Sequence, residues 1–97
     1  MTVVNFLDPA MDELQEAVEW YNRRDAGVGD ELLTEVDHAV DQLVYDPTAR
    51  PVVSRNVYRQ PLDRFPFDLL YRILPERIEI VAVAHHSRKP GYWQRRH

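Results

Sequence analysis

The sequence predicts an α+β domain in which a helical hairpin packs against a mostly antiparallel sheet. Two stretches of the N-terminal half, residues 8–24 and 30–45, carry apolar residues at the three- and four-residue spacing of amphipathic helices. In the C-terminal half, apolar residues fall on every second position of 65–73, which is typical of a strand with one buried face. Residues 78–84 are apolar apart from a single glutamate, which indicates a central strand covered on both faces.

The chain begins with a short apolar run, residues 3–7, that we expect to form the first strand. Asp8, followed by a proline, predicts the start of a helix, because aspartate can cap a helix and proline suits its first position. Glu13 in the first turn favours the helix dipole. The helix should extend to about Arg24, and we expect Trp20, at the flank of its apolar stripe, to belong to the core.

A second helix is expected after residues 27–29 interrupt the first one. Asp30 can cap this helix, and the pair Asp46-Pro47 ends it, because a residue before proline avoids the helical region. The connection is short, so the simplest arrangement is an antiparallel helical hairpin. His38 falls on the polar face and is expected to be solvated.

The C-terminal half is expected to form a three-stranded antiparallel meander. Residues 52–60 alternate in polarity and are closed by Pro61, which favours an edge strand. The strands at residues 65–73 and 78–84 are separated by the short polar segment 75–77 and should form a hairpin. The predicted fold class is therefore α+β, with an N-terminal strand, a helical hairpin and this meander.

The length and composition are typical of one small domain spanning residues 1–97. With 44% hydrophobic residues, the chain can bury one modest core. The absence of cysteine excludes disulfide and thiolate chemistry and fits a reducing cytoplasm. The apolar runs are shorter than the ~18 residues of a membrane span, so we expect no membrane partner.

The formal net charge of -4 conceals opposite charges in the two halves of the chain. Residues 1–50 hold twelve acidic and three basic residues, whereas residues 51–97 hold four acidic and nine basic residues. Such segregation predicts a folded molecule with one acidic and one basic surface. The alternative is that acidic helices simply lie beside a neutral sheet.

Basic and aromatic side chains cluster in the C-terminal half, and they are the main signal of a binding site. Arginine pairs with phosphate through two hydrogen bonds, aromatic rings stack on bases, and a histidine near a phosphodiester can act as a general acid or base. The same groups could instead bind an acidic protein surface. The members of this cluster are Arg59, Arg64, Arg72, Arg88, Lys89, Arg95 and Arg96, with Tyr58, Tyr92 and Trp93.

His85 and His86 stand side by side at the end of the central strand. Neighbouring strand residues point to opposite faces, so this pair is poorly placed to chelate one metal ion, and we expect neither a metal nor a cofactor. One of the two histidines is expected to cap the core. Arg88 follows closely as a binding residue, and the alternative for it is an ion pair with a helix carboxylate.

Several segments carry a family resemblance. They are Trp20-Tyr21 in the first helix, Arg59 before the hairpin, Arg64-Phe65-Pro66-Phe67 leading into Tyr71, and residues 83–93, VAHHSRKPGYW. Together with the order of strand, two helices and three strands, they resemble the RelE/ParE superfamily of toxins from bacterial type II toxin–antitoxin systems. The resemblance covers nearly the whole chain and implies a compact α+β toxin that is neutralised by an antitoxin encoded next to it.

Some members of this superfamily cut mRNA on the ribosome, and others poison DNA gyrase. The mRNA-cutting members use basic residues on the second and third strands, an arginine after the last strand and a C-terminal tyrosine. Arg59, Arg88 and Tyr92 match three of these positions, and His86 is the fourth candidate catalytic residue. The residues expected to bind the target or a nucleic acid are Arg64, Arg72, Lys89 and Trp93.

Two positions depart from the mRNA-cutting pattern. Asp68 stands where those members carry an arginine, and Pro61 replaces a second basic residue. A carboxylate there would repel the scissile phosphate, and a net charge of -4 opposes binding to the ribosome. The sequence therefore favours a ParE-like toxin with an essential target such as gyrase.

Other functions stay open at this point. The chain could be a ribosome-dependent mRNA endonuclease of the RelE type, so enzymatic activity is not decided. It could also be a non-toxic remnant that only binds an antitoxin. The oligomeric state is open between a homodimer and a hetero-oligomer with the antitoxin.

Overall fold

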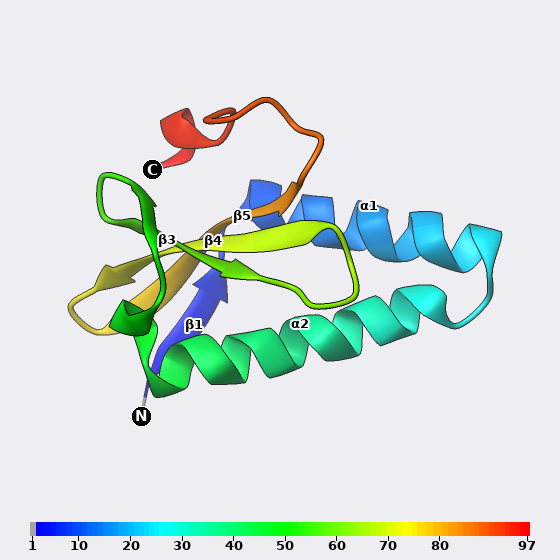
Figure 1. Cartoon of the computed structure of the whole chain (residues 1–97), viewed down its shortest axis with the longest axis horizontal. Helices are drawn as coiled ribbons and strands as arrows, with labels where there is room; N and C mark the ends of the chain where they lie inside the picture. Colours follow the sequence, from blue (N-terminus) through cyan, green and yellow to red (C-terminus); the bar gives the residue numbers. More distant parts are fainter. Residues whose placement is uncertain (1) are drawn as a thin grey trace.

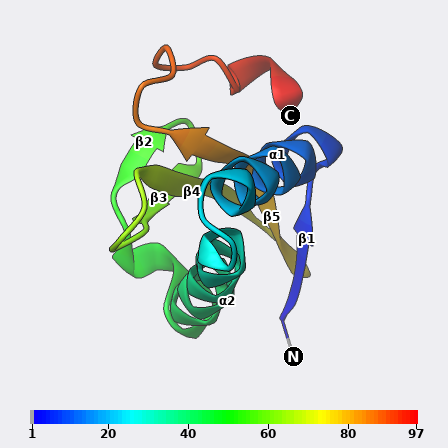
Figure 2. The same ribbon diagram turned by 90° about the vertical axis from the view of Figure 1, so that its right-hand side faces the viewer.

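The computed structural model describes residues 2–97 and contains a five-stranded mixed sheet with two helices on one face (Figures 1 and 2). The sheet order is β1-β5-β4-β3-β2, with β1 parallel to β5 and the other neighbours antiparallel. The predicted α+β class, with its N-terminal strand and helical hairpin, is confirmed. The elements are β1 (Val3–Phe6), α1 (Asp8–Arg24), α2 (Val28–Tyr45), β2 (Val52–Ser54), β3 (Val57–Pro61), β4 (Phe67–Leu74) and β5 (Arg77–His85), with 3-10 turns at Pro47–Ala49 and Gln94–Arg96.

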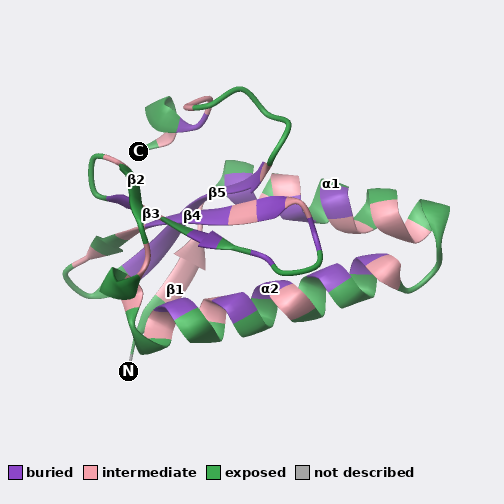
Figure 3. Ribbon diagram, viewed as in Figure 1, coloured by how far each residue is buried: buried purple, intermediate pink, exposed green. Residues whose placement is uncertain are grey.

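The main core lies between the helices and the face of the sheet that they cover (Figure 3). Leu32 and Leu43 of α2 and Leu69 of β4 are fully buried there, and each burial stabilises the fold by about 1.5–3 kcal/mol. β5 is buried from Ile78 to Ala84, as its apolar run predicted, because β1 and β4 flank it and both of its faces are covered. The middle position of the sheet itself belongs to β4.

A smaller apolar cluster covers the outer face of the sheet, away from the helices. The C-terminal segment, residues 86–97, folds back over this face (Figure 1), and Trp93 packs there with Val57, Leu70 and Val81. Trp93 is consequently only 6% exposed. The chain's own C-terminal segment therefore covers one end of the outer face.

Residues 52–60 form a β-hairpin, so the prediction of a single edge strand is wrong. β2 and β3 pair across a two-residue turn, with Ser54 opposite Val57. Asn56 in this turn has a φ of 54°, in the left-handed region that asparagine tolerates better than most residues. The antiparallel meander therefore has four strands, and β2 is its edge.

The predicted caps of both helices are also wrong. Asp8 is the first helical residue and makes no capping bond with its side chain, although its charge suits the helix dipole. α2 follows Gly27, which has a φ of 95°, and Asp30 lies inside its first turn. The start of α2 is capped instead by a side chain of α1, because Asn22 Oδ1 accepts the N–H groups of Gly27 (3.1 Å) and Gly29 (2.8 Å).

Trp20 lies on the surface, so its predicted place in the core is wrong. Its side chain is 44% exposed, and the Arg24 guanidinium lies 4.0 Å from the centre of its ring. α1 buries Ala10, Leu14 and Ala17, and Trp20 falls just outside the stripe that these residues define.

Candidate functional site

The four candidate catalytic residues meet at a hollow of about 630 Å³ on the outer face of the sheet, which we call the outer hollow. β3 contributes Arg59 and β4 contributes Asp68, because both residues sit at outward positions of their strands. The segment after β5 contributes the rest. These further lining residues include His86, Arg88, Lys89 and Tyr92, with Trp93 beneath them.

Asp68 is the acidic residue that contacts Arg59 and His86 in the outer hollow. Its carboxylate lies 3.1 Å from His86 Nε2 and 3.9 Å from the Arg59 guanidinium. The Asp68 side chain is 14% exposed, whereas those of His86 and Arg59 are about half exposed, at 50% and 46%. The carboxylate thus lies below the Arg59 guanidinium and the His86 imidazole, which face the solvent, and it neutralises part of the arginine's charge.

A second carboxylate, Glu13 of α1, organises the C-terminal segment. Tyr92 donates its hydroxyl to Glu13 Oε2 at 2.5 Å, and Arg96 donates to both oxygens at 2.8 and 3.0 Å. The Arg88 guanidinium lies 3.7 Å from the same carboxylate and 3.8 Å from the centre of the Tyr92 ring. The expected alternative for Arg88, an ion pair with a helix carboxylate, is therefore present in the structure.

The environment of Tyr92 disfavours its ionised form. Burial and the hydrogen bond to Glu13 raise the pKa of Tyr92 well above its ordinary value, against the opposing effect of Arg96 and Arg88. At neutral pH this phenol is a hydrogen-bond donor and not a base. Sequence reasoning missed Glu13, which it assigned to the helix dipole, because nothing in the local sequence signals a contact 79 residues away.

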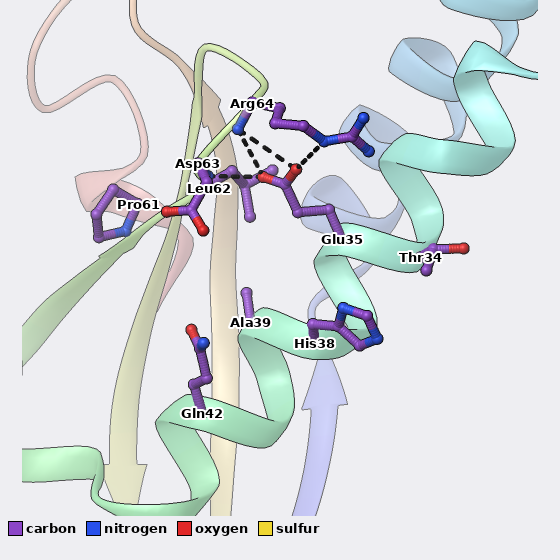
Figure 4. Close-up of a pocket in the computed structure, with 9 residues that line it drawn as sticks. All are labelled: Thr34, Glu35, His38, Ala39, Gln42, Pro61, Leu62, Asp63 and Arg64. Atoms are coloured by element: carbon purple, nitrogen blue, oxygen red, sulfur yellow. Dashed lines mark hydrogen bonds and ion pairs between the residues drawn. The ribbon is translucent and has the colours of Figure 1, made fainter.

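Three of the predicted binding residues are not open on the outer hollow. Arg64 lies on the helix side, where it pairs with Glu31 and Glu35 of α2 at 3.2 Å each. Figure 4 shows that Glu35 also accepts the backbone N–H groups of Asp63 (2.6 Å) and Arg64 (3.0 Å), so this carboxylate holds the β3–β4 connection on α2. The sequence placed Arg64 with the cluster only through its charge.

Arg72 and Trp93 are the other two predicted binding residues that are not open on the outer hollow. Arg72 is on the outer face but pairs at 2.7 Å with Glu79, its cross-strand neighbour, which is 4% exposed. Arg72 lines a separate hollow of about 460 Å³ beside the β2–β3 turn. The ring of Trp93 is buried, so it offers no open face for stacking.

The two adjacent histidines diverge, as strand geometry predicted. His85 packs its ring at right angles to that of Phe67 (5.0 Å between centres), and its Nδ1 accepts the Ser87 N–H at 3.0 Å. His86 turns to Asp68 in the outer hollow. His85 therefore caps the core.

Neither a metal site nor a membrane helix is found in residues 2–97. These residues hold no group of three or more His, Cys, Asp or Glu side chains arranged to bind a metal ion. Within the same residues, neither α1 nor α2 is long and apolar enough to cross a bilayer.

Comparisons with known proteins agree with the fold and the family resemblance. A search of curated proteins found no match. Among solved structures, the chain is similar to one titled "Chromosomal ParDE TA system from P. aeruginosa", with a TM-score of 0.76 and 18% identity, covering 88% of this chain and 96% of that chain. The family model "ParE toxin of type II toxin-antitoxin system, parDE" matches residues 4–90. Since that match spans most of its 97 residues, the chain belongs to the ParE family of type II toxin–antitoxin toxins.

Proposed function

We propose that this chain inhibits growth, that a cognate antitoxin neutralises it, and that its target is an essential protein machine, with DNA gyrase as the first candidate. The observation that carries the proposal is the pairing of Asp68 with Arg59 and His86 in the outer hollow. Such a target would place its site of action in the cytoplasm.

A protein target suits these groups better than a scissile phosphate does. Cations placed where negative charge develops favour the cleavage of a phosphodiester, and a carboxylate beside them weakens that effect. Asp68 opposes the charge of Arg59 and contacts His86, and Tyr92 is engaged as a donor to Glu13. A protein surface offers carboxylates, carbonyls and amides. Exposed arginine and histidine side chains can form hydrogen bonds with these groups, and no bond has to be broken.

The test is expression of the chain alone from an inducible promoter, followed by assays of DNA supercoiling and of mRNA integrity. We expect growth to stop, supercoiling by gyrase to fall and mRNA to stay intact. Co-expression of the small protein encoded by the neighbouring reading frame should restore growth. Cleaved mRNA together with normal supercoiling would contradict the proposed target.

A ribosome-dependent endonuclease is the second candidate, since Arg59, His86, Arg88 and Tyr92 do line one hollow. If the chain cuts mRNA, Tyr92→Phe should abolish cleavage, because the variant removes the hydroxyl and leaves the ring that packs on Arg88. Cleavage that persists in this variant would exclude a catalytic role for the tyrosine.

A further inference from the structure

The edge of β5 is closed by side chains where its neighbouring strand ends. β1 pairs with β5 only as far as Ile80, and beyond that point β5 has no strand on this side. Glu13 Oε1 accepts the N–H of Val83 at 3.1 Å, and Arg96 Nη1 donates to the carbonyl of Val81 at 3.3 Å. The Glu13–Arg96 ion pair therefore satisfies the backbone groups that a longer β1 would have bonded.

The same carboxylate reaches the lining of the outer hollow. Glu13 holds the Tyr92 hydroxyl at 2.5 Å, and the Tyr92 ring in turn lies 3.8 Å from the Arg88 guanidinium and 5.0 Å from that of Arg96. The Glu13 side chain is 13% exposed, whereas that of Arg88 is 51% exposed. A mostly buried anion thus sits behind a cation whose other side faces the solvent.

From this geometry we infer that Glu13 is a positioning residue for the outer hollow: it fixes Tyr92 and, through the Tyr92 ring, presents Arg88 to the target. The inference rests on the proposed function, which makes the outer hollow the target-binding site. Glu13 acts through other side chains and needs no contact with the target. Its role goes beyond stability, because it determines where the exposed cation lies and keeps the phenol as a donor.

Three variants separate this role from a general effect of charge. Glu13→Gln keeps the shape of the side chain and an acceptor for the Val83 N–H, but it removes the charge that Tyr92, Arg88 and Arg96 share. Glu16→Gln is the matched control, because Glu16 is an exposed carboxylate one turn further along α1. Glu13→Asp keeps the charge on a shorter side chain and should retain more function than Glu13→Gln.

The first measurement is the titration of Tyr92, obtained as the difference in tyrosinate absorbance between each chain and its Tyr92→Phe version. The pKa of Tyr92 is raised by burial and by the bond to Glu13. Glu13→Gln should therefore let tyrosinate form at lower pH, and Glu16→Gln should leave the titration unchanged. A merely structural carboxylate elsewhere on α1 would not move this signal.

The second measurement is growth inhibition, with circular dichroism to confirm folding. We expect Glu13→Gln to need about tenfold more inducer for the same inhibition, the change that loss of one charge-assisted hydrogen bond produces. A folded Glu13→Gln chain with parental inhibition, or with the parental Tyr92 titration, would overturn the inference. If Glu13→Gln does not fold, the Tyr92 titration and growth inhibition are measured on Glu13→Asp instead, and parental values of either would overturn the inference.

Failure of the proposed function gives a different pattern. A parent chain that does not inhibit growth overturns the proposed function and with it the role of Glu13 in target binding, whatever the titration gives. A toxic parent chain with an equally toxic, folded Glu13→Gln variant overturns only the role of Glu13.

Discussion

Tyr71 is one of two tyrosines, with Tyr92, whose ionisation should lower the stability of the fold at high pH. Burial raises the pKa of Tyr71 to about 12, and its hydroxyl donates to the Pro47 carbonyl at 2.6 Å. Near pH 10 the unfolded chain releases this proton while the folded chain keeps it, so the free energy of unfolding falls between about pH 10 and 12. Below pH 10 the contribution is fully present.

The change that tests this is Tyr71→Phe, followed by denaturant unfolding across that pH range. We expect the variant to lose about 1 kcal/mol near neutral pH, from the missing hydrogen bond, and to show a shallower fall in stability at high pH. Tyr45→Phe is the control, since Tyr45 is 92% exposed and should leave the pH profile unchanged. An equal alkaline fall in Tyr71→Phe and the parent chain would contradict the assignment.

Arg88 is the residue on which growth inhibition should depend most directly. Its ion pair with Glu13 is half exposed on the arginine side, and such a pair contributes only ~0–1 kcal/mol to stability. Arg88→Ala should therefore abolish inhibition with little change in melting temperature, and Arg88→Lys should restore little because lysine lacks the planar fork. Arg95→Ala, in the same segment and exposed, is the control and should remain toxic.

The two tryptophans show how far residue-level prediction reaches. The sequence placed Trp20 in the core and Trp93 on a binding surface, and the structure reverses both positions. Helix periodicity gives the direction of a side chain to within one position, so a residue at the flank of the stripe is ambiguous. Trp93 is buried by tertiary contacts with β3, β4 and β5, which no local pattern encodes.

At the scale of elements, α1 and α2 approach each other closely at Gly29. A Cβ atom there would lie 2.2 Å from the Val18 carbonyl oxygen and 2.7 Å from Asn22 Cγ, so alanine cannot fit unless the helices separate. Replacing glycine by alanine inside a helix otherwise stabilises the fold by up to about 1 kcal/mol. Overpacking lowers the free energy of unfolding by about 1–3 kcal/mol. Separation would also weaken the Asn22 cap, which is worth about 0.5–2 kcal/mol.

We therefore expect Gly29→Ala to lower the free energy of unfolding by about 1–3 kcal/mol, measured by denaturant titration. Asp37→Ala, at an exposed position of α2, is the control and should change stability by less than about 0.5 kcal/mol. A stabilised Gly29→Ala chain would mean that helix propensity outweighs the contact between the helices.

The helices and the two long strands could be predicted because their patterns are long enough to be distinctive. α1 ends at Arg24 as expected, and β5 follows the apolar run that predicted it. The β2–β3 hairpin was missed because the alternation of residues 52–60 continues through the turn, and Arg55 before Asn56 is not a typical turn pair. The pairing of β1 with β5 joins the two ends of the chain and has no local signature.

At the scale of the whole molecule, the opposite charges of the two halves help to hold the fold together. α1 and α2 carry ten acidic and two basic residues. Arginines from the C-terminal half pair with these helices, Arg64 with α2 and both Arg88 and Arg96 with Glu13. The site was therefore only partly predictable: the sequence named the basic residues of the outer hollow and placed Asp68 among them, but it did not indicate that Glu13 engages Tyr92, Arg88 and Arg96.

The exposed apolar surface of the molecule leads to the last prediction, which concerns a standing partner. Val52 and Val53 of the edge strand β2 are 59% and 45% exposed, and Tyr45 nearby in sequence is 92% exposed. Apolar side chains on a sheet edge favour association with another chain. A protein that binds only the folded state stabilises it by about 2.7 kcal/mol at a hundredfold excess over its Kd.

For a domain of this size, such a gain should raise the melting temperature by roughly 10–20 °C. The partner to test is the product of the neighbouring reading frame, mixed in excess with the purified chain and followed by thermal unfolding. An unrelated protein of similar size and charge controls for non-specific effects, since crowding contributes at most about 1 kcal/mol. If neither the neighbour's product nor the unrelated protein changes the melting temperature, the result would count against an antitoxin bound to the folded chain.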